Sequence, residues 1–265
     1  MAPEEFSHPV TALGSSAYYA VRFSPPARRR LLTLVLAWHQ EQRDVLVDCR
    51  DPGVARLKLQ WWRDELERAR SGRAEHPLSQ AMAPALRAGD LTPEPLVAMA
   101  DGAEIEARGW RPGDFIELME HTERDQGSLF ELLGRIIGVD DRDQIRALRQ
   151  LGAYAGLVCR IRDLGPQARR HRPCLPRDLW PADQIHGNQG TALTPVLGQL
   201  ASQSRDLVRQ ARRAAAGVPP VAVLTSLRDA LLDELEAAGF PVLDRRMSLT
   251  PLYKVWRAWR AASRR

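Results

Sequence analysis

The chain has 265 residues, of which 44% are hydrophobic, so it can bury a sizeable core and is not expected to be disordered. Its 38 basic and 33 acidic residues give a net charge of +5, and the two signs alternate, as in RLKLQWWRDELERAR, which argues against a nucleic-acid-binding patch. Three cysteines without CxxC spacing argue against a disulfide framework and against a zinc site.

The N-terminal sequence, MAPEEFSHPV, contains two glutamates and no apolar run, which argues against a signal or transit peptide. The longest clean apolar stretch is LLTLVLAW at 31–38, far shorter than the roughly 20 residues of a membrane span. We therefore expect a cytoplasmic protein. Peripheral contact with a membrane is left open, because the basic residues are nearly all arginine, which binds phosphate well.

Apolar residues recur at helical spacing almost throughout, so the predicted fold class is all-α. The breaker Asp51-Pro52-Gly53 separates the first two long helices. Helices are predicted over 28–49, 54–72, 93–108, 113–138, 141–164, 193–216, 219–238 and 249–263. Gly165-Pro166 is expected to end the fifth long helix and to leave 166–190 irregular. Residues 1–265 contain neither a repeat nor a long linker, so they are predicted to form one domain.

Two acidic segments lie near the ends of predicted long helices, RDVLVD at 43–48 and RDLGPQ at 162–167. A helical enzyme that ionises an isoprenoid diphosphate needs carboxylates on two facing helices, because Mg²⁺ ions must bridge them to the diphosphate oxygens. Aspartates four residues apart, such as Asp44 and Asp48, point two ligands at one spot.

Six fragments carry a resemblance to a known family, and they occur in family order: SSAYYA, RDVLVDCRDP, KLQWWRDEL, HPLSQAM, RIRDLGPQARRHRPCLP and TPLYKVWRAWR. The chain resembles the squalene/phytoene synthase family along nearly its whole length. That resemblance implies an isoprenoid-synthase-type helical bundle around a central cavity. In the enzymes of the family it implies Mg²⁺-dependent, head-to-head condensation of two isoprenoid diphosphates.

The first Asp-rich motif of the resembled family is lost here. Its two aspartate positions hold Arg43 and Val47, and the Asp44/Asp48 pair is turned from them by about 100° around the helix. In the second motif Arg162 and Asp163 match the family, whereas the later aspartate is Gln167. By this alignment Asp163 is the one principal metal ligand of four that survives.

The resemblance also assigns candidate site residues. His121 takes the place of a family tyrosine and is the candidate catalytic residue. The candidate diphosphate-binding residues are Ser15, Ser16, Tyr19, Arg162, Asp163, Arg169 and Arg172. The candidate metal ligands are Asp44, Asp48 and Asp163. Each has an ordinary alternative: surface charges for Asp44 and Asp48, an ion pair for Asp163, and a hydrogen-bonded helix residue for His121.

The lost ligands favour a non-catalytic protein that binds an isoprenoid diphosphate or lipid-like ligand in the cavity or assists assembly. The positions at which this chain departs from the family motifs resemble the branch of the family that includes a respiratory complex I assembly factor. A protein partner is therefore left open. One alternative is an active prenyltransferase, with Mg²⁺ as its cofactor and Asp44, Asp48 and Asp163 as ligands. Another is a purely structural helical partner with a collapsed cavity. Mg²⁺ is expected only if the protein is an active enzyme.

Overall fold

The computed structural model describes residues 6–170, 172, 175–182 and 185–263, which form helices and loops and contain no β-strand. This confirms the predicted all-α class. The long helices are α2 (Arg29–Asp48), α3 (Pro52–Arg70), α5 (Pro93–Ala107), α8 (Arg142–Arg162), α10 (Gly190–Val208), α11 (Pro219–Ala237) and α12 (Pro251–Ala262). The shorter ones are α1 (Ser16–Arg22), α4 (Pro77–Ala88), α6 (Phe115–Thr122), α7 (Ser128–Ile137) and α9 (Leu164–Arg169).

Local sequence explains where several helices begin. An aspartate side chain accepts a backbone N–H in the first turn of α3, α6 and α8, through Asp51, Asp114 and Asp141 respectively. Such caps satisfy N–H groups that have no partner within the helix. Proline occupies the first turn of α3, α4, α5, α11 and α12, where its missing N–H costs nothing.

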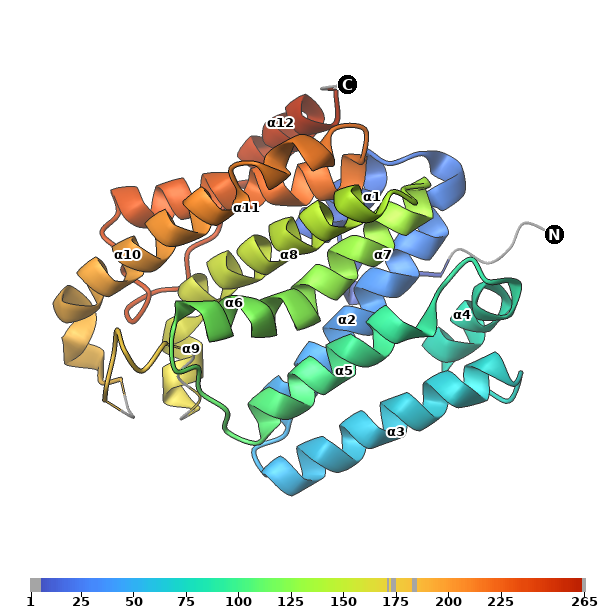
Figure 1. Cartoon of the computed structure of the whole chain (residues 1–265), viewed down its shortest axis with the longest axis horizontal. Coiled ribbons are helices and arrows are strands. Elements are labelled where there is room, and N and C mark those ends of the chain that lie inside the picture. The colour runs from blue at the N-terminus through green and yellow to red at the C-terminus, as the bar shows by residue number, and fades with distance from the viewer. Residues whose placement is uncertain (1–5, 171, 173–174, 183–184, 264–265) are drawn as a thin grey trace.

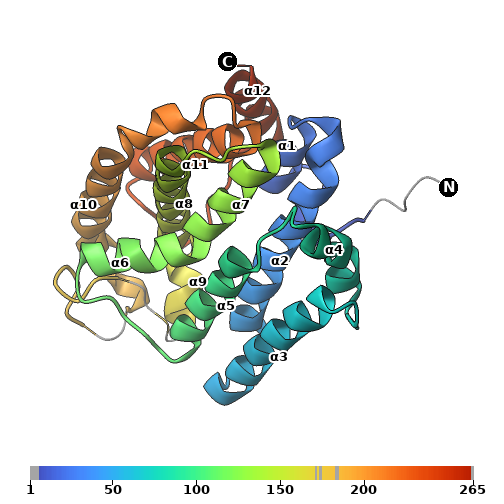
Figure 2. The ribbon, with the colours of Figure 1, turned by 45° about the vertical axis from the view of Figure 1, so that its right-hand side comes forward.

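The helices enclose a core that runs through α2, α5, α7, α8 and α11, with α3 and α4 outside α5 and α2 (Figures 1 and 2). Trp38 of α2 is fully buried, and its indole N–H donates to the Leu96 carbonyl of α5 at 3.0 Å. Its ring meets Trp62 of α3 edge-on, with the centroids 5.3 Å apart. Among the described residues, no helix is both long and apolar enough to cross a bilayer.

The predicted continuous helix over 113–138 is interrupted by a π-helical segment, Glu123–Gly127, between α6 and α7. The extra residue in such a turn redirects side chains and is frequent at functional sites. This segment packs closely on α8, where a Cβ atom added to Gly152 would lie 2.5 Å from the Gln126 carbonyl oxygen. A glycine at 152 therefore allows the two backbones to approach.

The prediction that Gly165-Pro166 leaves 166–190 irregular is wrong at its start. α8 ends at Arg162, and after Asp163 the short helix α9 continues to Arg169. Pro166 lies in the first turn of α9, where a proline removes no helical hydrogen bond. Asp163 consequently occupies the junction between two helices rather than a position within one.

Gly152→Ala tests the close contact between α8 and the π-helical segment. We expect the free energy of unfolding to fall by about 1–3 kcal/mol, because the new methyl group would overlap backbone that cannot easily move. Urea denaturation gives this quantity directly. Gly198→Ala in α10 is the matched control, since its Cβ would meet nothing within 4 Å. Helix propensity alone should then stabilise that variant by up to about 1 kcal/mol, and equal losses in both variants would contradict the explanation.

Candidate functional site

A cavity of about 520 Å³ lies between α2, α8 and α11. Its volume falls within the range of roughly 300–1,000 Å³ that is typical of small-molecule sites. Leucine side chains from three helices line it: Leu36 and Leu46 of α2, Leu129 of α7 and Leu224 of α11. Charged side chains line other parts of it in two separate groups.

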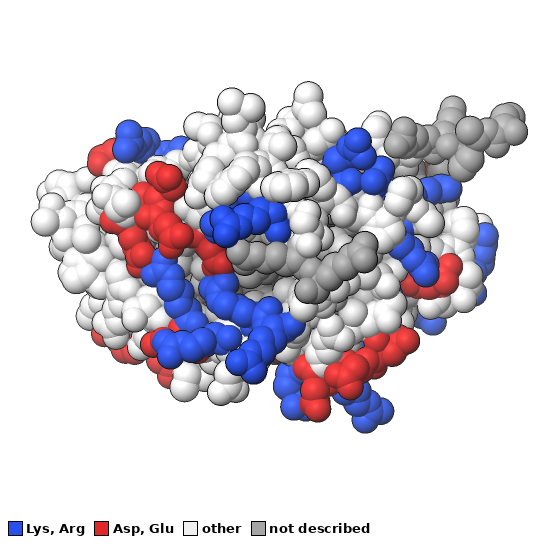
Figure 3. Space-filling view, turned by 90° about the horizontal axis from the view of Figure 1, so that it is seen from above, with Lys and Arg blue, Asp and Glu red and all other residues white. Residues whose placement is uncertain are grey.

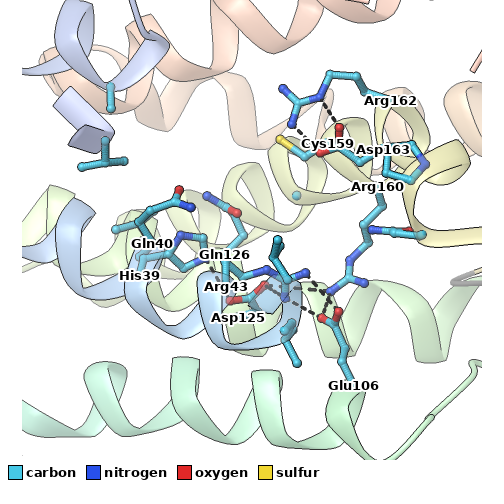
Figure 4. A pocket seen from close by; sticks show the side chains of 18 of the residues that line it. His39, Gln40, Arg43, Glu106, Asp125, Gln126, Cys159, Arg160, Arg162 and Asp163 are labelled. Carbon is cyan, nitrogen blue, oxygen red and sulfur yellow. Dashed lines mark hydrogen bonds and ion pairs between the residues drawn. The ribbon is translucent and has the colours of Figure 1, made fainter. Parts of the chain in front are cut away.

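The first group is a charge quartet of Arg43, Glu106, Asp125 and Arg160. Arg43 of α2 donates to Glu106 of α5 through Nη1 at 2.6 Å and Nη2 at 3.0 Å, and to Asp125 of the π-helical segment at 3.3 Å. Arg160 of α8 also donates to Glu106 and lies 3.9 Å from Asp125. Figure 4 shows both guanidinium groups directed at the two carboxylates. Two positive and two negative charges thus balance.

Two histidines flank the charge quartet. His39 Nε2 lies 3.0 Å from Asp125 Oδ1, and His121 Nε2 lies 3.0 Å from Glu106 Oε1. His121 is buried, packs on the Trp110 ring and is not among the described residues that line the cavity. The His121 ring thus contacts Glu106 and not the cavity, and a catalytic role for His121 stays a prediction.

Both carboxylates of the quartet stay ionised despite their burial. Burial alone would raise the pKa of Glu106, but the charges of Arg160 and Arg43 and the hydrogen bond with His121 hold it well below its ordinary value. Burial likewise opposes ionisation of Asp125, yet His39 and Arg43 lower its pKa to about 2. The quartet is thus a set of mutually compensating charges.

The second group surrounds Asp163, at the junction of α8 and α9. Arg162 donates to the Asp163 carboxylate through Nε at 2.9 Å and Nη2 at 2.5 Å, and Arg246 donates through Nε at 2.6 Å. Burial by itself would raise the pKa of Asp163, but these two arginines lower it. The one matching carboxylate of the family motif is therefore already paired with two guanidinium groups.

Two further cations, Arg228 of α11 and Lys254 of α12, lie within electrostatic range of Arg162 and Arg246. Arg228 borders the cavity, and no described residue forms a hydrogen bond or ion pair with it. Enclosure by protein, together with Arg162 and Arg246, lowers the pKa of the Arg228 guanidinium. We call the four cations Arg162, Arg228, Arg246 and Lys254 the cationic cluster. Arg162, Arg228 and Arg246 line the cavity, whereas Lys254 does not. With Asp163 as counter-charge, the three arginines leave an excess of positive charge at the cavity wall.

The candidate metal ligands Asp44 and Asp48 do not line the cavity. Asp44 accepts a hydrogen bond from Gln40 Nε2 at 2.6 Å, and Asp48 is exposed. α2 presents Arg43 and Val47 to the cavity instead. Adjacent residues on a helix are turned by about 100°, so the two aspartates point elsewhere and are not brought together with Asp163.

The serine-containing segment at the start of α1 also lies outside the lining. Ser15 caps α1 by accepting the Tyr18 N–H at 2.9 Å, and Ser16 is the first residue of the helix. Tyr19 is buried with its ring edge against Tyr18. Of this segment only Ala17 borders the cavity. Ser15, Ser16 and Tyr19, which were predicted to bind diphosphate, do not line it.

The two predicted loop arginines differ in placement. Arg169 is exposed and does not line the cavity. Arg172 does line it, and donates to the carbonyls of Leu46 at 2.6 Å and Cys49 at 3.0 Å. These are carbonyls at the C-terminal end of α2, so Arg172 caps that helix.

Sequence reasoning missed Glu106, Asp125 and Arg228. A signal for Glu106 was present, because it continues the buried stripe of α5 formed by Met99 and Ala103. A carboxylate on an apolar stripe requires a buried partner, and such positions often belong to functional sites. Asp125 had no comparable signal, because the π-helical turn that directs it inward does not follow helical periodicity.

The residues of this cavity do not fit the magnesium site that the family resemblance implies. Arg43 occupies a first-motif position and engages Glu106 and Asp125, while Val47 offers no oxygen ligand. Within the described ranges, no three acidic, histidine or cysteine side chains converge as a metal site would require. A divalent cation placed here would meet guanidinium groups, whose charge opposes its binding.

The pH dependence of unfolding tests the quartet. The folded-state pKa values of Glu106 and Asp125 lie below their unfolded values, so their stabilisation is complete above the unfolded values and is lost as the pH falls through the folded ones. We expect Asp125 alone to contribute about 2 kcal/mol that disappears between about pH 5 and pH 2. Urea denaturation over this pH range should give a shallower slope for Asp125→Asn. Asp140 is exposed and its side chain has no polar partner among the described residues, so a profile for Asp140→Asn as shallow as that of Asp125→Asn would contradict the assignment.

Comparison with known proteins agrees with this architecture. The family model for squalene/phytoene synthase matches residues 10–253. A presqualene diphosphate synthase of Rhodopseudomonas palustris is 29% identical over 178 residues, which are 67% of this chain and 63% of that protein, or less than two thirds of its length. The NADH dehydrogenase (ubiquinone) complex I, assembly factor 6 of Mus musculus is 23% identical over 261 residues, covering 92% of this chain and 78% of that protein.

Solved structures share the fold. A dehydrosqualene synthase in complex with ligand superposes with a TM-score of 0.77 at 16% identity, covering 94% of this chain and 90% of the other. Squalene synthase HpnC from Alicyclobacillus acidocaldarius gives a TM-score of 0.68 at 16% identity, with 84% and 88% covered. The helical architecture around a cavity and the match over nearly the whole sequence lead to one conclusion: the chain belongs to the squalene/phytoene synthase family.

Proposed function

We propose that this chain is a non-catalytic member of its family that binds an isoprenoid diphosphate, or a lipid-like molecule with an anionic head, in its cavity. The observation that carries the proposal is Arg228, which borders the cavity without a polar partner among the described residues. An enclosed guanidinium is costly unless an anion pairs with it. The anionic head of a ligand would provide that partner, beside Arg162 and Arg246.

The apolar part of the cavity supports the proposal that the ligand carries an isoprenoid or acyl chain. Leu36, Leu129 and Leu224 line it and come from α2, α7 and α11. An isoprenoid or acyl chain would remove this surface from water, at roughly 25 cal/mol for each Å² of apolar area buried. We propose that the ligand lies with its anionic head at the cationic cluster and its apolar chain along these leucines.

The absence of turnover is proposed from the charge quartet. Ionising an allylic diphosphate requires divalent cations that stabilise the departing diphosphate. At the four aligned ligand positions stand Arg43, Val47, Asp163 and Gln167, which supply one carboxylate. Arg43 also donates to Glu106 and Asp125, so these nearby carboxylates are not available as substitute ligands.

A second candidate function is Mg²⁺-dependent prenyl transfer. It is favoured by the relatives from Rhodopseudomonas palustris and Sinorhizobium fredii, both named presqualene diphosphate synthase. The Mus musculus relative, named as a complex I assembly factor, instead favours an assembly role with a protein partner for this chain. Ligand binding and turnover assays separate the enzyme from the binding protein.

Metal-independent binding is the first expectation. Farnesyl diphosphate should bind with similar affinity in Mg²⁺ and in EDTA, because guanidinium groups rather than metal ions hold the diphosphate. Arg228→Gln should weaken binding at least about tenfold, as expected for a lost hydrogen bond to a charged group. Isothermal titration calorimetry measures both effects. The control Arg146→Gln removes a charge exposed on the surface and should bind as the parent does. Farnesol should bind more weakly than the diphosphate, and binding that requires Mg²⁺ would contradict the proposal.

Diphosphate release is the second expectation. Parent protein incubated with farnesyl diphosphate and Mg²⁺ should release no more inorganic diphosphate than Asp163→Ala does, since one carboxylate cannot assemble the metal cluster. A coupled assay for inorganic diphosphate gives the comparison. Release by the parent that Asp163→Ala abolishes would assign the second candidate function instead.

A further inference from the structure

The C-terminal helix α12 presents its apolar side chains to solvent. Leu252, Val255, Trp256 and Trp259 are 84%, 40%, 46% and 57% exposed, and Ala258 is the one described residue of α12 that is buried. Their spacing of three, four and seven residues places them on one stripe of the helix. A surface helix ordinarily turns such a stripe towards the core, so this face is available for an external partner.

The charge of the same segment is one-sided. Residues 251–265 contain five lysine or arginine residues and no aspartate or glutamate. Lys254 and Arg257 donate to the carbonyls of Gly14 and Ser226, whereas Arg260 is exposed beside the apolar stripe. Arg260 lies over the Trp256 ring, with its guanidinium carbon 5.5 Å from the ring centroid. Figure 3, which views the molecule from the side of α12, shows mostly uncharged surface at its upper centre and lysine and arginine side chains across the middle and below, with acidic side chains at the left and lower right. The apolar stripe of α12 therefore has positive charge beside it.

The position of α12 leaves its exposed stripe accessible to an extended surface. The helix lies at the periphery of the molecule near the C-terminus, as both ribbon views show (Figures 1 and 2). Next to it Leu13 is 83% exposed, and Lys254 ties this region to α12 by donating to the Gly14 carbonyl at 3.0 Å. Leu13 thus extends the exposed apolar surface from a second segment of the chain.

We infer that α12 docks this protein on an anionic lipid bilayer, lying in the interface with Leu252, Val255, Trp256 and Trp259 among the headgroups. Amphipathic helices with tryptophan on one face and arginine or lysine beside it bind membranes in this way. Tryptophan prefers the interfacial depth, and each basic residue near an anionic surface adds roughly 1 kcal/mol. α12 packs on α11, the helix that carries Arg228, so docking brings that side of the protein to the bilayer.

Sedimentation with vesicles tests the inference. The parent should bind vesicles of phosphatidylcholine mixed with phosphatidylserine more tightly than vesicles of phosphatidylcholine alone, and added salt should weaken the binding. Leu252→Ser combined with Trp259→Ser should weaken it at least about tenfold, because two inserted apolar side chains are lost. Arg260→Glu should reduce the preference for anionic vesicles while the apolar stripe remains.

The matched control combines Leu57→Ser with Ile116→Ser, which removes two apolar side chains that are 73% and 67% exposed elsewhere. It should bind vesicles as the parent does, and thermal unfolding shows whether each variant is folded. A parent that binds neither vesicle type, or a folded α12 variant that binds as well as the parent, overturns the inference. A concentration-dependent dimer that the α12 variant loses, without vesicle binding by the parent, would assign this face to a second copy of the chain.

Discussion

Glu106 and Asp125 are ionised carboxylates enclosed by protein beside a cavity, and each needs positive charge next to it. That need limits which side chains can occupy the neighbouring positions. Removing an ionised carboxylate from water is costly unless a cation and further hydrogen bonds replace the lost solvent. Arg43 and Arg160 supply those bonds from α2, which carries the aligned positions 43 and 47, and from α8, which ends just before Asp163. A position that holds a guanidinium group paired in this way cannot also offer an oxygen ligand to a divalent cation.

Charge is therefore distributed unevenly over the cavity wall. The quartet is balanced, whereas the cationic cluster near Asp163 has more positive than negative groups. Electrostatic interactions are strong where little water screens them, so an anion in this cavity would favour the cluster over the quartet. The proposed ligand orientation follows from that difference: in the proposal, guanidinium groups would hold the head in place of metal ions.

Backbone packing makes the quartet geometrically feasible. Asp125 belongs to a π-helical segment that lies against α8, and Gly152 permits the close contact. The segment carries Asp125 towards α2, where His39 and Arg43 meet it. The inferred membrane-docking face is outside this network, but α12 and the cavity share a neighbour in α11. A ligand delivered from a bilayer and a cavity with a cationic wall would be compatible parts of one function.

The sequence by itself determined the helices and the loss of the first Asp-rich motif. Helical periodicity, capping aspartates and first-turn prolines are local signals, so α2, α3 and α5 start within a few residues of the predicted positions. The same periodicity correctly turned Asp44 and Asp48 away from the positions of Arg43 and Val47.

Only the tertiary structure decided which charges are paired. Glu106 and Asp125 are 63 and 82 residues from Arg43 in the sequence, and no local propensity encodes a contact at that separation. The π-helical segment breaks the periodicity from which side-chain directions are predicted, so Asp125 was missed. In the sequence Arg228 is one arginine among many; only packing encloses it at the cavity, where no described residue forms a hydrogen bond or ion pair with it. Burial and pairing depend on how distant helices meet, and those are the properties that define the site.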